Sequence, residues 1–394
     1  MTFSELLKKY KEGTLTEEEK ILVENELEKN EAINNYLAEN LELDSITSTI
    51  DESPSVISAK KVRKSVNHKL FKVILLSVAI VFSIILSINY IVSPLIASKY
   101  YNPTKHSLSK YQSNFVFDVR ALNELINPGY GISYASAENN GFGNYTLSLE
   151  SNNLFTKEKT SINYILKKNE PYARYNYFDN NNNSIRYNPL WSESKSSEAY
   201  KKELEYKEKE TKEIINYLAK LPNTSYVSSY VLFGEDITLN ELRELMYKYP
   251  SLKFNWTAIR VSNEKVQLPL GFRIDPSGDC QTMDTDYYNK YPALLLGDYL
   301  RTNDADSANG LVPIYIKHFK SLLEYLSDNT DFVNALTNFD LDFDKYLNFI
   351  KNNGIKSYGA LIYGNPNDII AFYENENILT IDIDNVLPSI YSSK

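Results

Sequence analysis

The run that decides the fold reads VILLSVAIVFSIILSINYIVSPLI and occupies residues 73–96. It carries no charged side chain. At 1.5 Å rise per residue it spans roughly 35 Å, enough for a tilted crossing of a bilayer. A buried core helix is the alternative, but polar linkers flank the run and it is long for a core helix. A cleaved signal peptide is disfavoured because a segment with helical patterns precedes the run. The sequence therefore predicts one transmembrane helix.

A linker over residues 53–72 precedes this helix and contains no acidic residue. Its basic residues are Lys60, Lys61, Arg63, Lys64, Lys69 and Lys72. The other flank is more sparsely basic, with Lys99, Lys105 and Lys110. Because the more basic flank of a membrane helix stays in the cytoplasm, we expect a single-pass cell-membrane protein with a cytoplasmic N-terminus and an extracytoplasmic C-terminus.

The head, residues 1–52, is strongly acidic, with five lysines against fourteen acidic residues and hence a net charge of −9. The negative electrostatic potential of the head repels nucleic acid and attracts a basic protein, so no direct nucleic-acid binding is expected. The apolar pattern predicts a helix near residues 2–12 that Gly13 ends, and a second helix that Thr16 and Glu19 cap as a capping box. Asn30 is the predicted cap of a third helix.

A chain this short buries little apolar surface, so each apolar residue of the head either belongs to its small core or lies on a stripe open to a partner. Core is the expectation for most of them, with at least one stripe exposed. The candidate partner-binding residues are Leu6, Leu7, Tyr10, Glu17, Glu18, Glu19, Leu22, Ile33, Tyr36 and Leu37.

The region beyond the span divides into a strand-rich segment, residues 100–195, and an α+β domain, residues 196–394. In the first, strands are expected from Asn114 (NFVFDVR), Asn144 (NYTLSLE) and Tyr172 (YARYNYF). The second begins with a charged helix over residues 196–221. Two β-α-β patterns follow, one from residue 225 to 261 and one from residue 358 to 384, which favours a ferredoxin-like element. The fold class predicted for the whole chain is α+β.

No residue pattern of the outer region carries recognisable chemistry, so the chain is expected not to be an enzyme. Hydrolase, metalloprotease and phosphate-loop motifs are absent from the sequence. The single cysteine and three dispersed histidines give no metal-ligand spacing, and no metal or cofactor is expected. Asp275-Pro-Ser-Gly-Asp279 fits a plain turn better than a calcium loop. Trp191 and Trp256 fit core or interface anchors better than ligand-stacking platforms.

The first hundred residues, with Leu-x-x-Tyr, then GTLTEEE at residues 13–19, an acidic helix, the basic linker and the span, resemble the N-terminal module of the sigma-factor-regulator family of membrane-anchored anti-sigma factors. Residues 224–394, ending in a Tyr-Gly strand, Gly364, a short helix and a strand to Asp384-Asn385-Val386, are similar to that family's C-terminal module. Many anti-sigma domains carry a zinc motif, but this head has no Cys and no His before His68, so the resemblance implies a zinc-free version.

The resemblance implies an anti-sigma factor that sequesters an extracytoplasmic-function sigma factor at the membrane and regulates transcription in response to an envelope signal. The partner would be the sigma factor, on the cytoplasmic side. The alternative is a cell-surface binding or envelope structural protein whose head is only a short cytoplasmic anchor.

Overall fold

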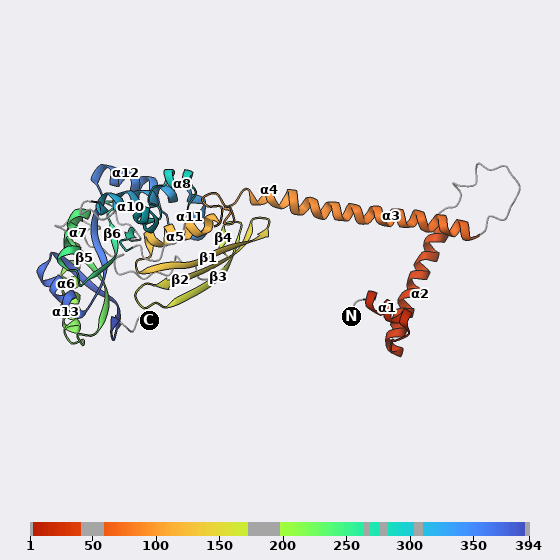
Figure 1. Cartoon of the computed structure of the whole chain (residues 1–394), viewed down its shortest axis with the longest axis horizontal. Helices are drawn as coiled ribbons and strands as arrows, with labels where there is room; N and C mark the ends of the chain where they lie inside the picture. Colours follow the sequence, from red (N-terminus) through yellow and green to blue (C-terminus); the bar gives the residue numbers. More distant parts are fainter. Residues whose placement is uncertain are drawn as a thin grey trace. The chain divides into compact units, whose positions relative to one another are not determined.

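The computed structural model describes residues 3–40, 59–171, 198–263, 268–275, 283–302 and 310–390. The chain forms two compact units, residues 1–87 and residues 88–394, which are described separately below. The first holds the head and most of the apolar helix. The second holds the end of that helix and the whole region that follows it (Figure 1).

The described part of the head, residues 3–40, contains two helices where three were predicted. Helix α1 (Phe3–Glu12) ends at Gly13, whose φ of 68° suits glycine, and α2 (Glu17–Asn40) begins at the predicted capping box. The predicted break at Asn30 is wrong. Its side-chain amide donates to the Glu26 carbonyl oxygen at 3.0 Å, one turn back within α2, instead of capping a new helix. No glycine or proline lies between residues 14 and 40, so the sequence contains no strong helix breaker at Asn30.

The apolar helix is continuous with the basic segment that precedes it. Helix α3 runs from Ala59 to Ser87, a π-helical turn η2 covers Ile88–Val92, and α4 covers Ser93–Ala97. The part long and apolar enough to cross a membrane is Val66–Ala97, and none of its most apolar window is buried. Proline lacks the backbone N–H of an ordinary helical turn, and the π turn directly before Pro94 removes the clash that its ring would make.

The first helix of the second unit after the apolar helix is α5 (Asn114–Ile126), where a strand was predicted from Asn114. The run NFVFDVR alternates like a strand, but over seven residues a period of two and a period of 3.6 are hard to tell apart. Continued to residue 126, the buried residues Phe115, Val119, Leu122 and Ile126 follow the helical period. Phe117 is buried as well, because α5 lies between strands on one side and other helices on the other.

A four-stranded antiparallel meander follows α5 in the order of the chain. Its strands are β1 (Tyr130–Gly141), β2 (Asn144–Asn153), β3 (Lys159–Lys167) and β4 (Glu170–Pro171). Strand β2 confirms the prediction from Asn144, since Tyr145, Leu147 and Leu149 alternate into the core. The run predicted as a strand from Tyr172 lies outside the described residues.

The second sheet has the order β7-β6-β8-β5-β9, and every neighbouring pair is antiparallel. The charged helix α6 (Glu198–Leu218) precedes it, as predicted. The elements of the sheet and its two connecting helices are β5 (Tyr226–Thr238), α7 (Leu239–Lys248), β6 (Lys253–Ile259), β7 (Gly271–Arg273), β8 (Lys356–Gly364), α13 (Pro366–Asn375) and β9 (Ile378–Leu387).

This order confirms the ferredoxin-like element. Strands β5 and β6 are parallel to each other but separated by β8, and β8 and β9 are parallel but separated by β5. Two split β-α-β units therefore interlock, which is the ferredoxin-like arrangement. The capping box predicted at the start of α7 is present, with the Glu241 backbone N–H donating to the Thr238 hydroxyl at 3.2 Å and the Thr238 N–H donating to the Glu241 carboxylate at 2.6 Å.

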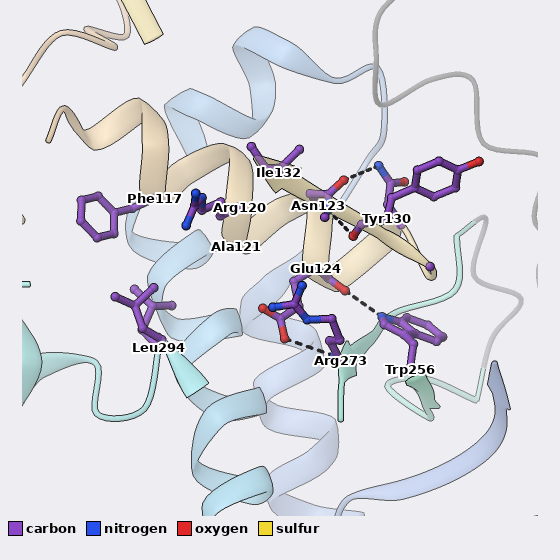
Figure 2. A pocket seen from close by; sticks show the side chains of 14 residues that line it. Phe117, Arg120, Ala121, Asn123, Glu124, Tyr130, Ile132, Trp256, Arg273 and Leu294 are labelled. Atoms are coloured by element: carbon purple, nitrogen blue, oxygen red, sulfur yellow. Dashed lines mark hydrogen bonds between the residues drawn. The ribbon is translucent and has the colours of Figure 1, made fainter. Parts of the chain in front are cut away.

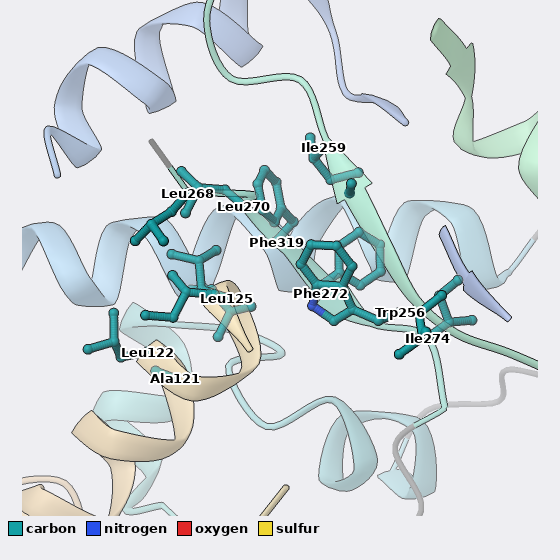
Figure 3. Close-up of a cluster of buried hydrophobic side chains, with 14 of the residues drawn as sticks. Ala121, Leu122, Leu125, Trp256, Ile259, Leu268, Leu270, Phe272, Ile274 and Phe319 are labelled. Carbon is teal, nitrogen blue, oxygen red and sulfur yellow. The ribbon is translucent and has the colours of Figure 1, made fainter. Parts of the chain in front are cut away.

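Helices inserted between β7 and β8 join the two sheets into one core: α8 (Thr285–Lys290), α9 (Leu296–Thr302), α10 (Leu311–Asp328), α11 (Thr330–Leu336) and α12 (Phe343–Asn353). Helix α10 packs on α5, and β7 packs on the same helix. Figure 3 shows Leu125 of α5, Phe272 of β7 and Phe319 of α10 in one cluster, with the two phenyl rings 5.8 Å apart. At Gly271 a side chain would meet the Thr257 carbonyl oxygen, so glycine permits this pairing of β7 with β6.

Candidate partner-binding surface

Three of the predicted site residues lie on α1, at the contact between the two helices of the head. Leu6, Leu7 and Tyr10 are half-buried, and the Tyr10 hydroxyl donates to a Glu24 carboxylate oxygen at 3.2 Å. Val23 of α2 is fully buried. These α1 residues therefore hold the helical pair together, so replacing them would disturb the packing of the head as well as any surface they form.

A second set lies along α2 and is open to solvent. Leu22, Ile33 and Tyr36 are 53, 56 and 66% exposed. Positions 22 and 33 are about three turns apart and position 36 is nearly one turn further, so the three share one face of the helix. We call them the α2 stripe. Leu37 follows within the same helix.

The α2 stripe is not continuous. Between Leu22 and Ile33 the same face carries Glu26 and Lys29, whose charged groups are 2.7 Å apart and exposed. An exposed pair of this kind contributes little to stability. It separates the stripe into one apolar position near the start of α2 and an apolar pair near its end.

The three acids at the start of α2 have different roles. The Glu19 carboxylate accepts the Thr16 backbone N–H at 3.1 Å and also contacts the Thr16 hydroxyl at 3.1 Å. The hydrogen bond from the Thr16 backbone, followed by that from its hydroxyl, lowers the pKa of Glu19. Glu17 and Glu18 are exposed and favourably placed at the positive end of the helix dipole. Glu19 is thus a capping residue, whereas the other two are available to a partner.

In the second unit the structure brings together a buried histidine and a carboxyl that the sequence did not indicate. His318 of α10 is fully buried, and its Nε2 lies 2.9 Å from a Glu124 carboxylate oxygen of α5. Its Nδ1 lies 2.6 Å from the Ala293 carbonyl oxygen. Both partners are oxygen acceptors, so the ring makes both hydrogen bonds as donor when it is an imidazolium opposite a carboxylate. The two residues are 194 positions apart, and no spacing in the sequence connects them.

The surroundings of Glu124 favour its ionised form. Burial by itself would raise its pKa, but the charge of His318, the hydrogen bond from that ring and the neighbouring Arg273 together lower it. The Arg273 backbone N–H donates to the carboxylate at 3.2 Å, and the Trp256 indole N–H donates to the Glu124 backbone carbonyl at 2.7 Å (Figure 2). Trp256 is therefore a core residue, as expected. Trp191 lies outside the described residues.

Glu124, Trp256 and Arg273 line a small cavity of about 30 Å³ between α5 and the start of β1. The cavity has room for about one water molecule. Such a volume excludes a substrate-sized ligand. Instead, the hydrogen bonds of Glu124 join α5 to Trp256 of β6, Arg273 of β7 and His318 of α10. We therefore interpret these four residues as stabilising the fold.

A second buried carboxyl lies where the chain leaves the membrane helix. The hydroxyls of Tyr101 and Tyr325 each donate to one oxygen of Asp118, which is 1% exposed. Burial raises the pKa of Asp118 to about 7, although both hydrogen bonds oppose the rise. Asp118 thus joins the segment after α4 to α5 and α10.

Among the described residues, no group of three His, Cys, Asp or Glu side chains is close enough to hold a metal ion. Asp275, the first residue of the predicted turn, forms an ion pair with Lys253 at 2.6 Å. The rest of that turn, with Cys280, lies outside the described residues.

An apolar helix long enough to cross a membrane, the one candidate span among the described residues, precedes a compact α+β domain of ferredoxin-like topology, and this combination is typical of a membrane-anchored protein. Residues 218–385 match the family described as sigma factor regulator C-terminal. The match begins at the last residue of α6 and ends within β9, so it covers the second sheet except the last two residues of β9, together with the helices inserted in it.

This match supports membership of the sigma factor regulator family and, in general, the role of an anti-sigma factor. No curated protein and no solved structure matches the chain. The assignment of the head to the family's N-terminal module stays a prediction from its residues.

Proposed function

We propose that this protein holds an extracytoplasmic-function sigma factor at the membrane through its head and releases it in response to an envelope condition reported by the outer domain. The family supports a sigma factor as the partner. The proposal puts the head in the cytoplasm, on the strength of the basic residues before the span. It assigns no catalytic step to the outer domain.

The observation that carries the proposal is the α2 stripe on an acidic head. Sigma factors use basic surfaces to hold promoter DNA, so the head's acids would steer the encounter and oppose DNA at the same surface. Solvent-exposed apolar side chains supply most of the affinity of such contacts once they are buried. In the α2 stripe, Ile33 and Tyr36 stand nearly one turn apart at the more apolar end and form the expected centre of the contact.

Substitutions of Ile33 and Tyr36 suit a test of binding because more than half of each residue is exposed to solvent. Ile33→Ala and Tyr36→Ala should each weaken capture of the sigma factor by about 5- to 150-fold, as expected for loss of about 1–3 kcal/mol at the centre of an interface. Ile21→Ala is the matched control, since Ile21 is 55% exposed but lies on a different face from Leu22.

The measurement is capture of each tagged extracytoplasmic-function sigma factor of the source organism by the full-length chain in detergent, together with a reporter of that factor's transcription. Ile33→Ala should raise the reporter and Ile21→Ala should not. If no sigma factor is captured and deletion of the protein leaves every such regulon unchanged, the proposal fails and a surface-binding or envelope structural role takes its place.

A further inference from the structure

The turn between β1 and β2 is in direct contact with the outer end of the apolar helix. The backbone N–H of Phe142, at the tip of this turn, donates to the Ser93 hydroxyl at 2.8 Å, and Ser93 is 8% exposed. The neighbouring turn between β3 and β4 lies beside it, since the Lys168 N–H donates to the Gly143 carbonyl at 3.0 Å. Asn169 of that second turn accepts the Tyr101 backbone N–H at 2.9 Å. The ends of two hairpins therefore hold the helix and the segment after it.

The position of Ser93 in the span fixes the depth of this contact. Ser93 is 20 residues beyond Val73, the start of the uncharged run, which corresponds to about 30 Å along a helix and to the thickness of the hydrocarbon core. Ser93 also falls inside the candidate span, which continues to Ala97. Whatever donates a hydrogen bond to Ser93 must then lie at the outer boundary of the bilayer.

The conformation and composition of the turn are informative as well. Phe142 has a φ of 56° between two glycines that also have positive φ, a conformation that a bulky side chain rarely adopts. Asparagine or glycine would suit the position better, so the conformation of the turn does not require the ring. Phe142 is partly exposed and is not among the residues packed into the hydrophobic core of the described chain.

We propose that the turn 141–143 is a second membrane contact of this protein, in which Phe142 sits in the outer interfacial layer beside the last turn of the span. Aromatic side chains favour that layer, and Tyr90 of the span is itself 76% exposed. Lys99 and Lys168, both exposed, flank the contact and suit lipid phosphate oxygens. The outer domain would thereby rest on the bilayer and hold the membrane helix through Ser93. This inference depends on the span and not on the sigma factor.

The test places an environment-sensitive fluorophore on single cysteines in the full-length chain with Cys280→Ser, reconstituted into phosphatidylcholine and phosphatidylglycerol vesicles. The labelled variants are Phe142→Cys and Lys168→Cys. Glu158→Cys is the control, because it lies in the exposed turn between β2 and β3, at the other end of the same strands and roughly 30 Å away.

Lipids carrying a nitroxide on the headgroup should quench the labels at 142 and 168 at least twofold more than the label at 158, and iodide in the buffer should quench 158 more. The second site keeps the test decisive if Phe142→Cys fails to fold. Equal quenching at 168 and 158 by both agents would overturn the proposal.

Discussion

Asp118 provides the sharpest prediction of a pH dependence, because its carboxyl is buried between two tyrosine hydroxyls and its pKa is raised to about 7. In the unfolded chain its pKa is near 3.9, so the folded protein binds the proton more tightly. The stability that this proton contributes is fully present below the unfolded pKa and is lost as the pH rises through about 7. Between pH 8 and pH 5 the gain amounts to about 3 kcal/mol.

Asp118→Asn keeps the shape of the side chain and removes the titration. Other carboxyls, such as Glu124, have lowered pKa values and lose stability as the pH falls, but they do so equally in both proteins and cancel in the difference. On going from pH 8 to pH 5, the free energy of unfolding of the wild type should therefore rise by about 3 kcal/mol relative to that of the variant.

The assay is urea unfolding of the full-length chain in detergent micelles at both pH values, followed by circular dichroism and fluorescence. Asp331→Asn, at an exposed position on the neighbouring helix α11, is the control and should show no such shift relative to the wild type. A difference between wild type and Asp118→Asn that changes by less than about 0.5 kcal/mol across this range would refute the reasoning, since substitutions at unperturbed surface sites give effects of that size.

Three further predictions concern topology, the head and the ionic pair. A reporter that is active only outside the cytoplasm should work when fused after Lys394 and not when fused at Glu52, and the reverse pattern would contradict the orientation. Glu19→Ala should lower the helical circular dichroism of residues 1–52 and their unfolding free energy, because it removes half of a capping box, whereas Glu18→Ala should leave both nearly unchanged. Equal losses in the two variants would show that the cap is unimportant. His318→Ala should destabilise the second unit by about 3–5 kcal/mol in urea unfolding, because it removes the imidazole that faces a buried carboxylate and leaves it only the hydrogen bond from the Arg273 backbone N–H; a loss under 1 kcal/mol would rule out an ionic pair there.

Signals that act over a few residues were sufficient to predict much of this protein. The uncharged run predicted the apolar helix, because the length and hydrophobicity of a span are properties of consecutive residues. The caps at Thr16 and Thr238 were predictable since a capping box needs only four residues. Strands β5, β6, β8 and β9 and helix α13 follow from local periodicity in the same way. At least one exposed apolar stripe in the head was expected because so short a segment buries few side chains, but most of its apolar residues were expected in the core, and which ones stay exposed depends on where α1 packs.

Tertiary structure decided the rest, because the deciding contacts join residues far apart in the chain. The run from Asn114 satisfies both a strand and a helix over seven residues, and packing between the meander and α10 selects the helix. Asn30 could cap a helix or lie within one. The helix continues through it because no glycine or proline lies between residues 14 and 40. The contact of Glu124 with His318 and the hydrogen bonds from two tyrosines to Asp118 form only once α5 and α10 pack together. Local pattern determines which elements form, but burial and charge at each position depend on the neighbours that the fold supplies.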